Sequence, residues 1–173
     1  MTDRRMVRTW AEIDLDALAH NYRLLRELDP GARFLGLVKA NAYGHGAAPV
    51  AKKLERLGAD MLAVACLDEA IELRQAGISL PILCLGQTPP ELAGELLEYD
   101  ITQTVSDLET GKALSAAAVA AGRRLKIHVK VDTGMGRLGF VWGEPPTADA
   151  ARDIIVLSTL PGLKAEGIFT HFS

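Results

Sequence analysis

Short apolar runs alternate with longer amphipathic segments along nearly the whole chain. Six of these runs have the length and the mostly uninterrupted apolar character of parallel strands that are buried on both faces: Phe34–Val38, Met61–Ala65, Pro81–Leu85, Thr102–Val105, Lys126–Asp132 and Gly167–Phe172. The segments between them have the periodicity and length of helices. Repeated strand and helix units predict an α/β fold with right-handed crossovers.

Local signals predict where several helices begin and end. Asp16 is placed to cap a first helix. Thr88 before Pro89 predicts another helix start, and Ser106 with Glu109 fits a capping box for a further one. Three glycines fall where helices would end: Gly58, Gly77 and Gly122.

The number of strand and helix units limits the architectures that this chain can form. A TIM-type (β/α)₈ barrel has eight strands and about 250 residues, whereas this chain of 173 residues stops after the sixth strand. An open doubly wound sheet is the alternative, but no glycine-rich dinucleotide fingerprint follows the first strand. We therefore expect residues 16–173 to form an incomplete barrel that leaves the edges of the first and sixth strands unpaired.

The segment before the first predicted helix has a different pattern. Trp10–Asp14 alternates apolar and acidic residues, which predicts a half-exposed strand. Residues 1–15 are therefore expected to lie outside the barrel and to pair with a second β domain that this chain does not contain.

Composition excludes several classes of protein. The chain is 49% hydrophobic, and its 19 Lys and Arg against 22 Asp and Glu give a net charge of −3, so nucleic acid is not an expected partner. No segment has the length and apolarity of a membrane span or a secretory leader, which predicts a cytoplasmic protein. Cys66 and Cys84 lie in apolar runs and are predicted to be buried core residues, and no metal site is expected.

Lys39 is the first candidate for chemistry. It directly follows the first strand, and Asn41–Gly46 forms the glycine-containing loop after it, with Tyr43 as a hydroxyl donor. The carboxyl ends of barrel strands build the active-site face. A lysine in a low-dielectric position there has a lowered pKa, and its neutral amine can form a Schiff base with an aldehyde cofactor. A solvated lysine beside a turn is the alternative on the residues alone.

The segment KIHVKVDTGMGRLGF is the second candidate. It begins with an alternating strand, in which three apolar residues face one way and four ionisable residues the other: Ile127, Val129 and Val131 against Lys126, His128, Lys130 and Asp132. An edge strand with one solvated face stays open as an explanation. The glycine-containing turn that follows delivers Arg137 to the loop face, where a guanidinium suits a carboxylate ligand.

These segments resemble those of alanine racemases. LVKANAYGHG is similar to the attachment signature for pyridoxal phosphate (PLP), and KVDTGMGRLGF and GIFTHFS resemble two later segments of the family. The resemblance implies that Lys39 binds PLP, that Tyr43 bonds its phosphate, and that Arg137 faces the ring oxygen and the substrate carboxylate. It also implies that His171 lies against the ring and that Lys130 is a candidate for carbamylation.

The resemblance also implies a reaction. Alanine racemases interconvert L- and D-alanine, supply D-alanine for the cell wall, and act as homodimers with shared sites. The second catalytic base of the family is a tyrosine from the second domain of the partner subunit, and most of the phosphate site follows the sixth strand. We therefore expect the 173-residue chain alone to bind PLP weakly and not to racemise alanine.

Three alternatives remain open on the sequence. The first is another amino-acid racemase of the same family. The second is a single-domain PLP-binding barrel without racemase activity, although such proteins lack the leading WAEIDLDAL segment. The third is an inactive remnant of a racemase.

Overall fold

Parallel pairing of short strands organises the protein, whose computed structural model describes residues 9–143 and 148–173. In chain order the elements are α1 (Leu15–Leu28), β1 (Leu35–Leu37), α2 (Lys39–Tyr43), α3 (Ala47–Leu57), β2 (Met61–Val64), α4 (Leu67–Gln75), β3 (Ile82–Cys84), η2 (Pro90–Leu92), α5 (Ala93–Glu98), β4 (Ile101–Val105), α6 (Leu108–Ala120), β5 (Leu125–Asp132), β6 (Phe140–Val141), α7 (Ala148–Thr159) and β7 (Leu163–Thr170).

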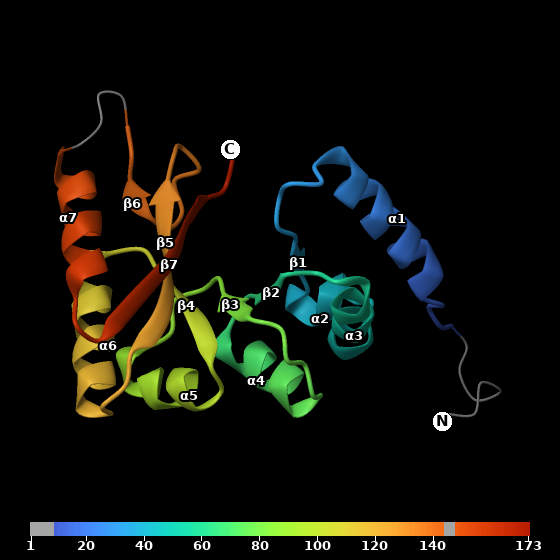
Figure 1. The fold of residues 1–173 in the computed structure, drawn as a ribbon, viewed down its shortest axis with the longest axis horizontal. Coiled ribbons are helices and arrows are strands. Elements are labelled where there is room, and N and C mark those ends of the chain that lie inside the picture. Colours follow the sequence, from blue (N-terminus) through green and yellow to red (C-terminus); the bar gives the residue numbers. More distant parts are fainter. Residues whose placement is uncertain (1–8, 144–147) are drawn as a thin grey trace.

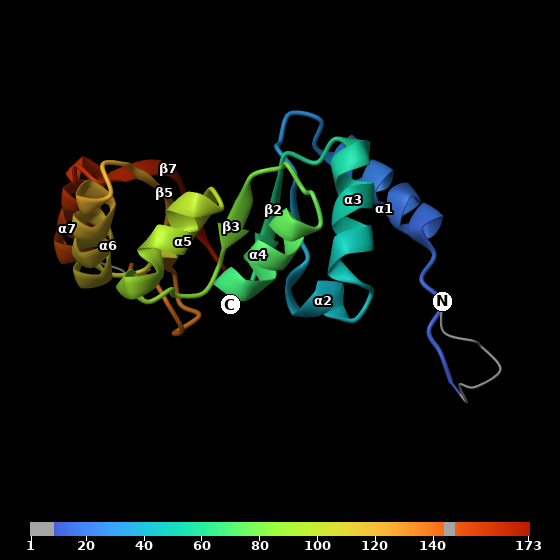
Figure 2. The same ribbon diagram turned by 90° about the horizontal axis from the view of Figure 1, so that it is seen from below.

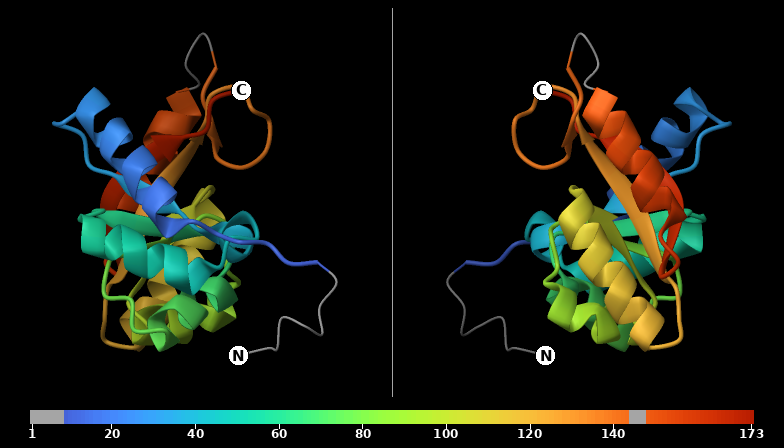
Figure 3. Two further views of the ribbon diagram at one scale, coloured as in Figure 1. Left: turned by 90° about the vertical axis from the view of Figure 1, so that its right-hand side faces the viewer. Right: turned by 90° about the vertical axis from the view of Figure 1, so that its left-hand side faces the viewer.

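The strands form one sheet in the order β1-β2-β3-β4-β5, with every pair parallel, and β7 pairs along the length of β5. The short β6 pairs with the end of β5, where Val131 lies opposite Phe140. Figure 1 and Figure 2 show the elements following one another in a curved row. The two end-on views in Figure 3 place α1 in front at one end of the row and α7 in front at the other.

One apolar cluster joins the strands to the helices. Leu62 of β2, Ile82 of β3 and Ile127 of β5 are fully buried in it, together with Leu73 of α4 and Leu114 of α6. Burying each such side chain contributes about 1.5–3 kcal/mol to folding. The cluster fixes the strands, and therefore the positions at which the loops leave their carboxyl ends.

The predicted α/β alternation is confirmed, with changes at the end of the chain. The last strand is longer than expected and begins at Leu163, four residues before Gly167, and β6 was not predicted. Within the described ranges β1 pairs only with β2 and β7 only with β5, so the row of strands does not close. None of the described helices is long and apolar enough to cross a membrane.

Two predicted helix caps are wrong. Asp14 caps α1, because its Oδ1 accepts hydrogen bonds from the backbone N–H groups of Asp16 (2.8 Å) and Ala17 (3.0 Å). Asp16 therefore lies inside the first turn. Asp107 caps α6 by accepting from the Thr110 N–H at 2.7 Å. Ser106 is buried directly after β4, where its hydroxyl accepts a hydrogen bond from Gln87 (2.7 Å), so the expected capping box does not form.

The other helix boundaries agree with the sequence. Residues with positive φ end or follow α3, α4 and α6 at the three predicted glycines: Gly58, Gly77 and Gly122. The turn predicted at Thr88 and Pro89 leads into η2, which begins at Pro90.

The environment of three other segments differs from expectation. β5 lies between other strands, so its interpretation as an edge strand is wrong, and Lys126, His128 and Lys130 line two cavities of the molecule. Cys84 is buried as predicted, but Cys66 is exposed because it follows β2 and is the N-cap of α4. Residues 9–14 form neither helix nor strand, so the strand expected at Trp10–Asp14 is absent. The division at residue 15 stays a prediction, and residues 1–8 lie outside the described chain.

Candidate active site

Lys39 lies at the carboxyl end of β1 and begins an unusual turn. The four residues after it, Ala40–Tyr43, have φ values of 51–54°, so α2 is a left-handed turn and not a right-handed helix. Left-handed backbone costs a residue with a side chain roughly 1–2 kcal/mol. Four such residues in a row persist only where surrounding contacts hold them.

Side chains from inside and outside the turn supply these contacts. Glu69 of α4 accepts hydrogen bonds from the Ala40 N–H and the Ala65 N–H, each at 2.7 Å. The Asn41 side chain accepts from the Ala47 N–H (2.7 Å), and His45 Nδ1 lies 2.8 Å from the Ala42 carbonyl oxygen. His45 therefore fixes the loop backbone.

Arg137 is positioned by the loop that follows β5. Asp132 is buried at the end of β5 and accepts backbone hydrogen bonds from Gly134 (3.0 Å), Gly136 (3.1 Å) and Arg137 (3.1 Å). Hydrogen bonds from Gly136 and Gly134 lower the pKa of the Asp132 carboxyl below its usual value. Gly139 completes the loop at φ 134°, where a Cβ atom would lie only 2.6 Å from the Asp132 nitrogen.

The predicted site residues converge on one small cavity. This cavity of about 120 Å³ is lined by side chains from the ends of β1, β3, β5 and β7 and from the loop after β5: Lys39, Leu85, Lys130, Met135, Arg137, Leu138, Phe169 and His171. Four of the five predicted site residues are among them. Tyr43 is not, although its ring centroid lies 6.0 Å from Lys39 Nζ, and its side chain is exposed.

The charge of this cavity favours an anionic ligand. Lys39, Lys130 and Arg137 bring three cationic groups to it, and none of its eight lining residues carries a carboxylate. Lys130 Nζ donates to the Val131 carbonyl (3.0 Å) and lies 5.5 Å from the centroid of the Phe169 ring. Phosphate and carboxylate groups are the ligands that such a set of donors binds.

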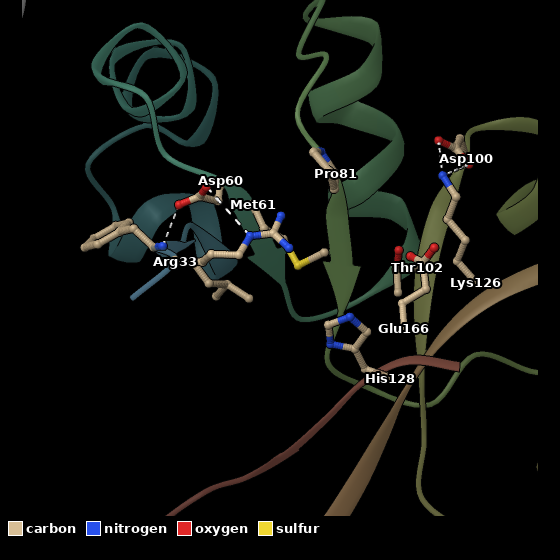
Figure 4. A pocket seen from close by; sticks show the side chains of 11 residues that line it. Arg33, Asp60, Met61, Pro81, Asp100, Thr102, Lys126, His128 and Glu166 are labelled. Carbon is tan, nitrogen blue, oxygen red and sulfur yellow. Dashed lines mark hydrogen bonds and ion pairs between the residues drawn. The ribbon is translucent and has the colours of Figure 1, made fainter. Parts of the chain in front are cut away.

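A larger cavity of about 580 Å³ lies at the opposite ends of the strands (Figure 4). Its charged groups are largely paired with each other: Arg33 with Asp60 at 3.7 Å, and Lys126 with Asp100 at 2.8 Å. His128 points into it, and burial lowers the pKa of its imidazole. Because loops at the carboxyl ends of parallel strands carry the chemistry in barrels, we assign the site to the smaller cavity.

Sequence reasoning missed the residues that support this site. Glu69 and Asp132 line neither of these two cavities, yet they hold the backbone next to Lys39 and Arg137. The available signal for Glu69 was its place three residues after the N-cap of a helix, from which glutamate reaches back to backbone N–H groups.

Comparison with known proteins decides the family. Residues 13–173 match the family described as alanine racemase, N-terminal domain. The chain belongs to the alanine racemase family. Its α/β architecture is that of the barrel domain of alanine racemases, present here in incomplete form.

Individual alanine racemases are similar to this chain over nearly its whole length. The alanine racemase of Clostridium perfringens is 47% identical over 164 residues, which are 95% of this chain and 42% of the relative. A solved alanine racemase from Clostridium difficile, in complex with cycloserine, is 44% identical to this chain, with a TM-score of 0.91. The match covers 97% of this chain and 45% of the solved chain.

A racemase of another specificity is also similar. The histidine racemase of Leuconostoc mesenteroides is 32% identical, with a TM-score of 0.82, and the match covers 93% of this chain and 42% of that one. The chain thus spans about two fifths of the length of the racemases that it matches.

Proposed function

We propose that this chain is the PLP-binding part of an enzyme that interconverts L-alanine and D-alanine and so supplies D-alanine for the cell wall. One observation carries the proposal: Lys39, Lys130, Arg137 and His171 line a single cavity at the carboxyl ends of parallel strands. The family membership of the chain supports the choice of reaction.

The residues of the cavity fit PLP. Its phosphate and ring oxygen are anionic, and the cavity is cationic and free of carboxylates. Lys39 would hold the cofactor through its amine, the exposed Tyr43 hydroxyl would bond the phosphate, and His171 would lie against the ring. When bound, PLP supplies an aldehyde that bonds to an amine and a conjugated ring that withdraws electrons from the substrate α-carbon.

Two side chains of this chain would bind the substrate and transfer the α-proton. Arg137 would hold the substrate carboxylate through its guanidinium fork, which fixes the α-carbon relative to Lys39. Lys39 Nζ would take or return the α-proton on one face. Inversion needs a second base on the opposite face, and we propose that the partner subunit of a homodimer provides it.

Lys130 is the proposed site of carbamylation. Its neutral amine would add to carbon dioxide and lose one proton, which gives a carboxylate beside Arg137 that orients the guanidinium. Both side chains line the same cavity, which supports the proposal. Intact-mass measurement should find a gain of one carbon dioxide that disappears on acidification. A chain that never carries this mass would contradict carbamylation.

The reaction is tested in the protein that carries this chain at the length of its relatives. Alanine incubated with it in heavy water should gain deuterium at the α-carbon and become racemic. Lys39→Ala should reduce both rates at least about a hundredfold, because one base is lost. Exchange and inversion that persist in Lys39→Ala would contradict the assignment. The 173-residue chain alone should show no turnover.

A racemase for another amino acid is the second candidate. The similarity to a histidine racemase supports it, because the same framework serves another substrate there. Comparing alanine, serine and histidine in the exchange assay decides between them. The cytoplasmic location and the absence of nucleic acid and membrane partners stay predictions from the sequence.

A further inference from the structure

The parallel ladder between β1 and β2 ends beside Lys39. Its last hydrogen bond runs from the Val38 N–H to the Ala63 carbonyl at 2.9 Å. Two residues farther along each segment, the Ala40 N–H and the Ala65 N–H donate to Glu69 Oε1 and Oε2. One carboxylate therefore joins the two chain segments at the point where their direct pairing stops.

Its place in the first turn of α4 brings the Glu69 side chain close to these two N–H groups. Cys66 is the N-cap of α4 and makes no side-chain capping bond, and Glu69 is the third residue of the helix, half-buried in its first turn. A carboxylate is stabilised there by the partial positive charge of the helix N-terminus. One oxygen reaches back to the segment before its own helix, as in a capping box, and the other crosses to the Lys39 turn.

The bond to Ala40 acts on the backbone next to the cofactor lysine. Ala40 is the first of the four residues with positive φ, and this conformation sets the direction in which the chain leaves Lys39. If the Ala40 N–H lost its hydrogen bond to Glu69, the turn could relax to right-handed backbone. Lys39 would then move relative to the other residues of the cavity.

We propose that Glu69 is a positioning residue, which holds the left-handed turn and thereby keeps Lys39 in place to bond an aldehyde cofactor. This inference rests on the proposed function of Lys39. Among the described residues, Glu69 accepts hydrogen bonds from the backbones of Ala40 and Ala65 and not from Lys39 or Arg137, so it acts through the Ala40 backbone.

The experiment measures labelling of Lys39 in the protein that carries this chain at the length of its relatives. This protein is incubated with PLP and treated with borohydride, which reduces each lysine–aldehyde linkage to a stable secondary amine. Peptide mass spectrometry then gives the label on Lys39 relative to exposed Lys112. Glu69→Gln keeps the shape of the side chain and loses its charge. Glu72→Gln makes the same change one turn along α4 at an exposed position and is the matched control.

Three results are distinguishable. The proposal expects Glu69→Gln to lower the Lys39-to-Lys112 ratio about tenfold, as for the loss of a hydrogen bond to a charged group, with Glu72→Gln unchanged. An unchanged ratio in Glu69→Gln overturns the role of Glu69 and leaves the function of Lys39 intact. No preference for Lys39 in the unaltered protein at the length of its relatives overturns both.

A second measurement needs no variant and covers the case in which Glu69→Gln does not fold. Amide exchange in the unaltered chain should be slow at Ala40, although this residue is exposed, because its N–H donates to Glu69. Exchange at the rate of an unprotected amide near neutral pH would overturn the proposal.

Discussion

The backbone N–H of Arg137 donates to Asp132 Oδ2 at 3.1 Å, across a loop of four residues. The same carboxylate binds the N–H groups of Gly134 and Gly136 through its other oxygen. The position of the guanidinium therefore depends on a residue that does not line the cavity. Asp132 thus connects the end of β5 to the proposed carboxylate-binding group.

The first prediction concerns Asp132→Asn. The amide retains one acceptor oxygen and replaces the other by a donor that repels a backbone N–H, so the loop loses its fixed shape. In the protein at the length of its relatives, we expect kcat/KM for alanine to fall about ten- to a hundredfold, because Arg137 is displaced. Asp149→Asn, at an exposed position of α7, is the control and should retain full activity. Equal activity of the two variants would contradict the role of Asp132.

The second prediction concerns acid stability. Backbone hydrogen bonds favour the ionised form of Asp132 and lower its pKa in the folded chain. The stability that this carboxylate contributes is therefore complete above the pKa of the unfolded state and is lost as the pH falls through the lower folded value. Urea midpoints of the chain should drop between about pH 5 and about pH 2, and less steeply in Asp132→Asn. Parallel pH profiles of both proteins would show that Asp132 is not responsible.

The third prediction concerns the two thiols. Cys66 is exposed at the start of α4, whereas Cys84 is buried in β3, and burial raises the pKa of the Cys84 thiol. At about pH 8, a thiol reagent should modify Cys66 rapidly and Cys84 only at the rate of unfolding. Peptide mapping after short exposure identifies the labelled residue. Rapid labelling of Cys84 in the folded chain would contradict the buried position of β3.

The sequence predicted most strands and the residues that line the cavity, but not the residues that hold the backbone around them. Lys39 and Arg137 lie in continuous segments with a specific pattern, so both could be identified without coordinates. Glu69 was missed because its contact with Ala40 joins positions 29 residues apart, which no local periodicity reveals.

Short-range geometry explains the remaining errors. Asp14 and Asp16 are both acceptable caps by residue type, and only the backbone angle at Asp14 decides between them. Cys66 continues an apolar run, but the chain turns into α4 at that residue and exposes it. β6 has only two residues, which is too short for any alternation to appear.

The most direct test of the account is the identity of the lysine that binds PLP. The protein at the length of its relatives is mixed with PLP, reduced with borohydride, digested and mapped. We predict one dominant pyridoxyl group, on Lys39, and no comparable label on Lys130, which lines the same cavity. A dominant label on Lys130 or on any other lysine, or an even spread over all of them, would contradict the proposed site.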